Sequence, residues 1–289
     1  MFQGLSAFPV TPSDETGRID TDSLQRLLAP LVEAKVHSIG LLGSTGSYAY
    51  FGRAERQRAI RAAVECVAGR VPLLVGVGAL RTDDTVDLVR DAKAAGADAG
   101  LLAPVSYVPL LDDEVFEHFR TVGEATDLPL VIYNNPGTTH FTFRPELTGR
   151  LSHLPTVAAV KNPAPDAAAV PALLTELRSR VAPGFSLGFS VDLNAAGALL
   201  AGGEAWYSVL GGTFPKVCLR LLEAARSGNA AEARRIHDSL APVWAMFNKY
   251  TSYRVVHALA GTRPSRPVLP LSDEAEAEVR QALAPLALT

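Results

Sequence analysis

One lysine is distinguished by its place in the sequence. Lys161 follows an apolar run at residues 156–160 and precedes an Asn-Pro pair that we interpret as a turn. The run is short, β-branched and without polar alternation, which is typical of a strand buried on both faces. Only five lysines stand against 22 arginines, and no other lysine follows such a run. We therefore expect Lys161 at the end of a strand, where α/β proteins bind their ligands.

Hydroxyl-bearing residues follow other apolar runs of the same kind. Ser44 and Thr45 come after the second run, Tyr107 follows the fourth, and Tyr133 closes the fifth. In a barrel of parallel strands these ends face one mouth. An amine surrounded by hydroxyls suits imine chemistry, because protons must move as a carbinolamine becomes an imine. Burial should also lower the pKa of the lysine, since desolvation disfavours its charged form.

The Gly-Ser-Thr-Gly turn at residues 43–46 suggests a second role. It runs from an expected strand toward a helix that begins near Arg53, so its N–H groups and hydroxyls suit a small anion. A carboxylate beside a carbonyl carbon, as in a 2-oxo acid, fits that arrangement. The alternative is that Ser44 and Thr45 only cap the turn, which small hydroxyl residues commonly do.

Eight apolar runs separated by amphipathic stretches must position these residues. The expected strands are residues 5–8, 38–42, 73–77, 100–103, 130–133, 157–161, 186–189 and 206–209. Eight strand–helix units predict an α/β fold, a (β/α)8 TIM barrel. An open doubly wound sheet would normally carry a Gly-rich phosphate turn after its first strand, where this chain has Pro9-Val10-Thr11-Pro12. Asp192 and Asn194 either line the pocket or cap the helix after the seventh strand, and capping is the expected role.

The last part of the chain lacks strand signals. Residues 216–227, 230–247, 250–260 and 273–283 are expected to be helices, more than one closing barrel helix requires. We expect a barrel over residues 1–225 and a helical C-terminal extension, residues 226–289, packed on it. No linker rich in Pro, Gly or Ser separates the two parts.

Composition excludes several classes of function. A net charge of -3 without a basic cluster indicates no nucleic-acid partner. No stretch approaches the roughly 18 apolar residues that span a bilayer, and no secretory signal opens the chain, so we expect a cytoplasmic protein without a membrane partner. Cys66 and Cys218 are expected to be reduced. No metal-ligand spacing, dinucleotide motif or phosphate-binding loop of the Walker type is present, so no metal and no cofactor are predicted.

The motifs together carry a family resemblance. They are the opening segment at residues 4–12, the Gly-Ser-Thr-Gly motif at 43–46, Tyr-Asn-Asn-Pro at 133–136 and Val-Lys at 160–161. In this order and spacing, the chain resembles the dihydrodipicolinate synthase / N-acetylneuraminate lyase family of pyruvate-dependent class I aldolases. The resemblance covers essentially the whole length.

The resemblance implies roles for individual residues. Lys161 would form a Schiff base with the 2-oxo group of pyruvate or a related 2-oxo acid, and Tyr133 would move protons above the imine. Ser44 stands for a family threonine in the hydroxyl relay, and Thr45 would bind the pyruvate carboxylate. Tyr107 resembles a tyrosine lent to a neighbouring subunit in a homotetramer, a dimer of dimers. Further expected substrate-binding residues are Gly43, Thr138, Thr139, Ser190 and Tyr207.

Departures from the family pattern concern the second substrate. Thr138 stands where dihydrodipicolinate synthases carry an arginine for a carboxylate, and that contact is charge-assisted. Ser47 replaces a common glutamate, and residues 188–192 lack the Asp-Glu pair expected of a sialic acid lyase. We therefore expect a family member that is neither of the two named enzymes.

The leading hypothesis is a Schiff-base lyase for reversible aldol cleavage or condensation of pyruvate with an aldehyde, or cleavage of a 2-oxo sugar acid. One alternative is a dehydratase or deaminase that works through the same imine on a 2-oxo sugar acid. Product analysis distinguishes it from an aldolase, because dehydration leaves the carbon skeleton intact. Others are 4-hydroxy-tetrahydrodipicolinate synthase proper and a non-catalytic barrel that only binds a 2-oxo acid. A binder would not exchange the methyl protons of pyruvate with deuterated water.

Overall fold

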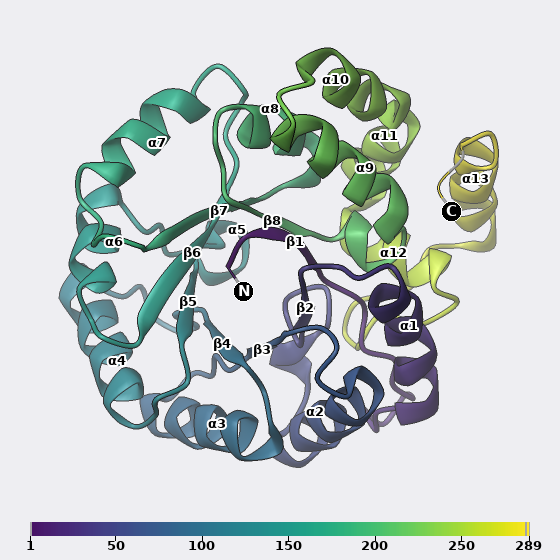
Figure 1. Cartoon of the computed structure of the whole chain (residues 1–289). Helices are drawn as coiled ribbons and strands as arrows, with labels where there is room; N and C mark the ends of the chain where they lie inside the picture. Colours follow the sequence, from purple (N-terminus) through teal and green to yellow (C-terminus); the bar gives the residue numbers. More distant parts are fainter. Residues whose placement is uncertain (1, 287, 289) are drawn as a thin grey trace.

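The computed structural model describes residues 2–286 and 288. Eight parallel strands pair with their chain neighbours and close into a barrel, with β1 also pairing with β8 (Figure 1). The (β/α)8 prediction is confirmed. The strands are β1 (Gly4–Ala7), β2 (Ser38–Leu41), β3 (Leu73–Gly76), β4 (Ala99–Leu102), β5 (Leu130–Tyr133), β6 (Val157–Pro163), β7 (Ser186–Ser190) and β8 (Ala205–Ser208).

Alternation along the strands divides the core into two layers. On β5, Leu130 and Ile132 belong to the cluster between strands and helices, whereas Val131 and Tyr133 belong to the barrel interior. Tyr133 is paired with Lys161 across β5 and β6, so both residues occupy the same level of the barrel. The register of two neighbouring strands therefore brings the amine and the phenol together.

Helices surround the barrel and connect its strands (Figure 1). They are α1 (Thr21–Glu33), α2 (Arg53–Val67), α3 (Thr82–Ala95), α4 (Asp112–Glu124), α5 (Pro136–Thr139), α6 (Pro145–Ser152), α7 (Val170–Arg178), α8 (Ala195–Leu200) and α9 (Pro215–Arg226), with short 3₁₀ turns η1 (Tyr48–Tyr50), η2 (Asp192–Asn194) and η3 (Leu210–Gly212). The turn η1 and the short helix α5 follow β2 and β5 directly, so both lie at the carboxyl ends of strands.

The C-terminal part is helical, as expected. It contains α10 (Ala230–Ser239), α11 (Ala241–Tyr250), α12 (Ser252–Leu259) and α13 (Asp273–Leu283), which gather on one side of the barrel in Figure 1. The single helix expected over residues 230–247 is two helices, with Pro242 in the first turn of α11. Proline favours that position because it lacks an N–H group. The division after residue 225 stays a prediction, and it falls at the end of α9.

The segment after Lys161 differs from the expectation. Asn162 and Pro163 do not turn; they extend β6 and pair with Phe189 and Ser190. Pro163 is tolerated because it is the last residue of the strand. Asn162 accepts a hydrogen bond from the Asn134 amide at 2.9 Å, which ties β6 to the end of β5.

No helix in the described residues is long and apolar enough to cross a membrane.

Candidate active site

The Lys161 side chain is enclosed by aromatic rings. It is 4% exposed, and its Nζ atom lies 3.7 Å from the ring centroid of Phe8, 4.2 Å from that of Tyr133 and 5.9 Å from that of Tyr207. Burial lowers the pKa of Lys161 below its usual range, although Tyr133 and the Asp192 carboxylate favour the charged form. The amine is therefore easier to deprotonate than a solvated lysine, which is what a nucleophile requires.

A hydroxyl pair lies beside the amine. The Tyr133 hydroxyl donates to Ser44 Oγ at 3.0 Å, and the Asn135 side-chain amide donates to both oxygens at 3.1 Å. Asn135 thus orients both oxygens, and the Tyr133 proton lies along the hydrogen bond between them. Tyr133 lies on β5, Lys161 on β6 and Ser44 in the segment after β2. Three different strands therefore bring these predicted neighbours together.

These residues line one cavity of about 680 Å³ at the carboxyl ends of the strands. Most of the predicted site residues contribute to its wall, namely Ser44, Thr45, Tyr133, Thr138, Lys161, Ser190 and Tyr207. Buried Tyr207 has no hydrogen-bond partner for its hydroxyl among the described residues. Burial raises the pKa of Tyr207, so this phenol keeps its proton and can donate it to a ligand.

Three predicted residues are not brought to the cavity wall. Gly43 lies behind Phe8, and a side chain at residue 43 would place a Cβ atom 2.7 Å from that ring. Thr139 donates to the backbone oxygen of Asn135 at 3.0 Å, so its hydroxyl stabilises α5. Tyr107 is 95% exposed and does not reach this chain's own cavity. None of these three residues is among those that line the cavity.

The expected capping role of Asp192 and Asn194 is wrong. Asp192 accepts from Trp206 Nε1 at 2.8 Å and from the Leu210 N–H at 2.7 Å. Asn194 makes no cap hydrogen bond and donates instead to the Ala164 carbonyl. Burial raises the pKa of Asp192, and the two hydrogen bonds oppose that effect. Asp192 is instead one of the residues that line the cavity, and its two hydrogen bonds join the ends of β7 and β8.

Three of the seven described non-glycine residues with positive φ lie in the cavity wall. Val191 has φ 68° and Thr251 has φ 70°, and both are β-branched residues for which positive φ is unfavourable. Ser47, with φ 58°, is a third wall residue of this kind. Strain of this sort persists where surrounding structure holds it, and it is common at ligand sites.

The whole chain has relatives of known family. The dihydrodipicolinate synthetase family model matches residues 1–286. The chain belongs to this family. A dihydrodipicolinate synthase of Agrobacterium tumefaciens has a crystal structure with a TM-score of 0.97 and 48% identity, covering 99% of this chain and 98% of that one. The 4-hydroxy-tetrahydrodipicolinate synthase of Alcanivorax borkumensis is 32% identical over 98% of this chain and 97% of its own length.

A further structural relative has a bound 2-oxo acid. It is a prophage protein of the dihydrodipicolinic acid synthase family from E. coli K12, in complex with pyruvate, at a TM-score of 0.92 and 26% identity, with both chains covered completely. The family consists of class I, pyruvate-dependent aldolases that form Schiff bases, and the present chain is a lyase of this kind.

Several residues beside Lys161 or in the cavity wall of this aldolase were not predicted from the sequence. Phe8 could have been found, because it continues the inward alternation of Ser6 on β1. Asn135 lay within a recognised motif but was not assigned. Tyr253 and Arg254 carry no signal of their own, since they come from α12 and reach the cavity only through the packing of the C-terminal helices.

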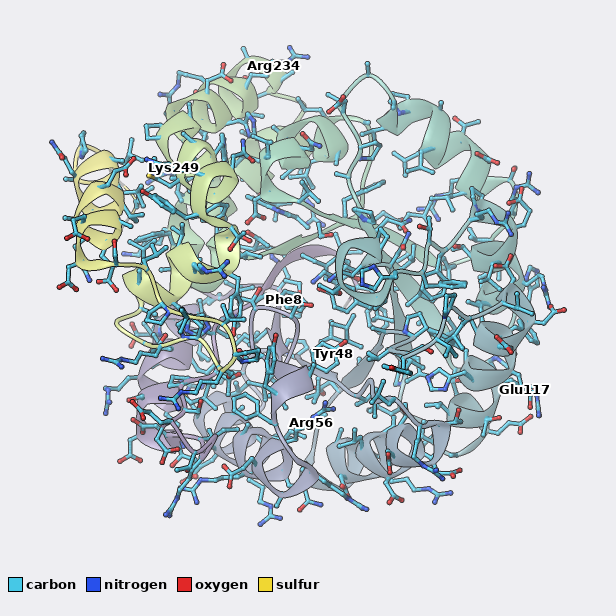
Figure 2. The ribbon with its side chains drawn as sticks, turned by 180° about the vertical axis from the view of Figure 1, so that it is seen from behind. Phe8, Tyr48, Arg56, Glu117, Arg234 and Lys249 are labelled. Carbon is cyan, nitrogen blue, oxygen red and sulfur yellow. The ribbon has the colours of Figure 1, made fainter. Side chains whose placement is uncertain are left out.

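Arg56 holds one side of the cavity in place. Its guanidinium donates to the backbone oxygens of Tyr48 at 2.6 Å, Gly78 at 3.0 Å and Phe51 at 3.2 Å. Burial lowers the pKa of Arg56 to about 10. Figure 2 shows Tyr48 and Arg56 close to each other within the ring of helices. These bonds fix the η1 turn that carries the cavity residues between Ser47 and Tyr50.

Proposed function

We propose that Lys161 forms an imine with pyruvate and that the derived enamine makes or breaks a carbon–carbon bond with an aldehyde. The observation that carries this proposal is the buried Lys161 amine beside the hydrogen-bonded Tyr133–Ser44 pair. The neutral amine attacks C2 of pyruvate, and loss of water from the carbinolamine leaves the imine. Loss of a C3 proton gives the enamine, which adds to the aldehyde carbonyl. Water then hydrolyses the product imine and frees the lysine.

Tyr133 is the proposed proton carrier in these steps. Its hydroxyl can give a proton to the departing carbinolamine oxygen and recover one from Ser44, because the two oxygens are 3.0 Å apart. Thr45 and its neighbouring backbone N–H groups are the proposed carboxylate site. Thr138, Ser190 and Tyr207 are the proposed contacts of the remaining substrate atoms, since all three line the cavity.

The test is reductive trapping. Incubation with pyruvate and borohydride should attach a reduced pyruvate to Lys161, found by peptide mass mapping, and Lys161→Ala should remove the adduct. The relative from A. tumefaciens serves as a positive control for the trapping procedure. A folded protein that traps nothing while the control traps normally contradicts the proposed imine.

The named relatives favour 4-hydroxy-tetrahydrodipicolinate synthase as a second candidate. The aldehyde partner of pyruvate would then carry a carboxylate of its own. Residue 138 disfavours this reaction, because the neutral Thr138 cannot form an ion pair with a second carboxylate. Analysis of the products formed from pyruvate with a panel of aldehydes decides between the two, because the second candidate yields 4-hydroxy-tetrahydrodipicolinate. A product that keeps the intact carbon skeleton of a 2-oxo sugar acid would instead reveal a dehydratase or deaminase.

We also propose a homotetramer, a dimer of dimers, that acts in the cytoplasm. The support is an exposed apolar group in the segment after β4, where Tyr107, Val108 and Leu111 are 95%, 59% and 69% exposed. Apolar side chains gathered in this way commonly mark an interface. Sedimentation of the wild type and of Tyr107→Glu, which places a charge in that group, tests the assembly.

A further inference from the structure

The cavity of Lys161 contains a second cation. Its lining residues in the described chain include two basic side chains, Lys161 from β6 and Arg254 from α12. Its acidic lining residue, Asp192, already uses both carboxylate oxygens for Trp206 and Leu210. The guanidinium of Arg254 is therefore a cation of this cavity that the imine chemistry does not use.

Arg254 is free to bind a ligand. Among the described residues its single direct hydrogen bond goes from Nη1 to Thr251 Oγ1 at 3.4 Å, near the upper limit for such a bond. Within residues 2–286 and 288, no carboxylate lies within 4.0 Å of its guanidinium, whereas Arg53, Arg144 and Arg178 each form ion pairs. A planar guanidinium with unused donors matches a carboxylate in geometry as well as charge.

The position of Arg254 is held by its neighbour in the chain. The Tyr253 hydroxyl lies 2.7 Å from Ser47 Oγ and accepts from the Ser265 N–H at 3.3 Å. These contacts join α12 to the loop after β2 and to the segment after α12. Arg254 is thus presented from a tethered helix, and little ordering of the backbone is needed when an anion binds.

The chemistry of the proposed reaction places one substrate end away from the lysine. The carboxylate of pyruvate stays beside the imine carbon, and an aldol product extends from C3 into the remaining cavity. Thr138 is neutral, and its hydroxyl donates to the Asn135 carbonyl at 3.3 Å. Arg254 is the cationic group left to receive the far end of that product.

We propose that Arg254 binds a carboxylate at the end of the second substrate remote from its aldehyde. The product is accordingly a 2-oxo acid with a second carboxylate at the far end of its chain. This inference rests on the proposed imine at Lys161. The C-terminal helices would then select an anionic second substrate, whereas the barrel supplies the reactive residues Lys161 and Tyr133.

The test uses product-like 2-oxo acids, so no aldehyde needs to be identified. Cyanoborohydride trapping on Lys161 is measured against concentration for 2-oxoglutarate and 2-oxopentanoate, and for 2-oxoadipate and 2-oxohexanoate. The members of each pair differ by a terminal carboxylate in place of a methyl group. The wild type should trap the dicarboxylate at lower concentration in at least one pair. Arg254→Ala should reduce that preference about 10- to 100-fold, the range of a charge-assisted hydrogen bond.

Three controls make the outcome specific. Pyruvate trapping should be the same in the wild type and in Arg254→Ala, and Arg254→Lys should restore part of the preference. Arg234→Ala removes an exposed arginine of α10 that lies at the outer rim in Figure 2, and it should change nothing. Arg254→Gln replaces the alanine variant if that protein does not fold.

The outcomes separate this inference from the proposed function. If the wild type traps no 2-oxo acid at all, the imine proposal fails and Arg254 loses its assigned role with it. If pyruvate is trapped normally but the wild type shows no preference for a dicarboxylate, or Arg254→Ala keeps that preference, the imine proposal stands and the role of Arg254 is overturned.

Discussion

The Nζ atom of Lys161 lies 3.7 Å from the centroid of the Phe8 ring, so the reactive amine rests on an aromatic face. The ring excludes water from one side of the amine and also attracts its charged form. Since burial is the larger influence, the pKa of Lys161 is lowered. The rate of pyruvate trapping should therefore rise with pH through a midpoint below the ordinary lysine value of 10.5.

Two substitutions of Phe8 distinguish the effect of excluding water from the attraction between the ring and the charged form of the Lys161 amine. Phe8→Ser admits water, so the pKa of Lys161 should return toward its ordinary value and the midpoint of the trapping profile should move to higher pH. Phe8→Leu keeps the site dry but removes the ring, so the midpoint should stay or move to lower pH. The rate of pyruvate trapping, measured between pH 6 and 10, gives the midpoint for each variant. Shifts of both variants in the same direction would contradict this account.

The Tyr133 hydroxyl should be needed for proton transfer rather than for binding. Tyr133→Phe removes the group that donates to Ser44, and exchange of pyruvate methyl protons with deuterated water should slow by about 10²- to 10⁴-fold. Ser44→Ala should slow exchange in the same direction, and Ser44→Thr should keep it. Proton NMR of pyruvate follows the exchange directly.

Tyr250→Phe is the matched control for that experiment. The Tyr250 hydroxyl contacts Glu278 on α13, outside the cavity, so its loss should leave exchange unchanged. If Tyr133→Phe exchanged protons at the wild-type rate while Lys161→Ala did not, another group would have to carry the proton.

Gly43 should act through Phe8. A Cβ atom at residue 43 would lie 2.7 Å from the Phe8 ring, so Gly43→Ala must displace the ring from its place beside Lys161. We expect slower pyruvate trapping and a loss of roughly 1–3 kcal/mol in the free energy of unfolding, the usual result of overpacking. Gly52→Ala is the control, because a Cβ atom there meets nothing within 4 Å. Unchanged trapping in Gly43→Ala would show that Phe8 does not govern the amine.

The sequence was informative where regular structure positions a side chain. Tyr133 and Lys161 are the paired ends of two apolar runs, and alternation with a period of two places them both inside the barrel. The eight runs predicted the closed sheet for the same reason, because buried parallel strands have a distinctive composition. The course of Asn162 and Pro163 was not predictable in this way, since their strand pairing depends on hydrogen bonds with β7.

Contributions from the C-terminal helices could not be predicted from local pattern. Tyr253 lies 206 positions after Ser47 in the chain, yet their hydroxyls are 2.7 Å apart. That contact depends on how α12 packs, and no residue near Tyr253 carries a motif that reveals it. Arg254 was likewise indistinguishable in the sequence from the other arginines, because what distinguishes it is that no carboxylate of the described residues lies within 4.0 Å of its guanidinium.

His257 should make the stability of the protein depend on pH. It is 1% exposed, its Nδ1 atom lies 2.8 Å from Thr262 Oγ1, and its Nε2 atom has no hydrogen-bond partner in the described structure. Burial lowers the pKa of His257 from 6.5 to about 4. Below pH 6.5 the unfolded chain therefore binds a proton at this residue that the folded chain does not bind until about pH 4.

The free energy of unfolding should accordingly fall as the pH is lowered from 6.5 to about 4, by about 1.4 kcal/mol per pH unit from this residue. His257→Phe keeps a ring against Tyr253 but cannot titrate, so its stability should depend less steeply on pH over that window. Urea unfolding at pH 7.5, 6.0 and 5.0 measures the difference between the two proteins, with His140→Gln as an exposed control. Equal slopes for the wild type and His257→Phe would mean that His257 is protonated in the folded protein.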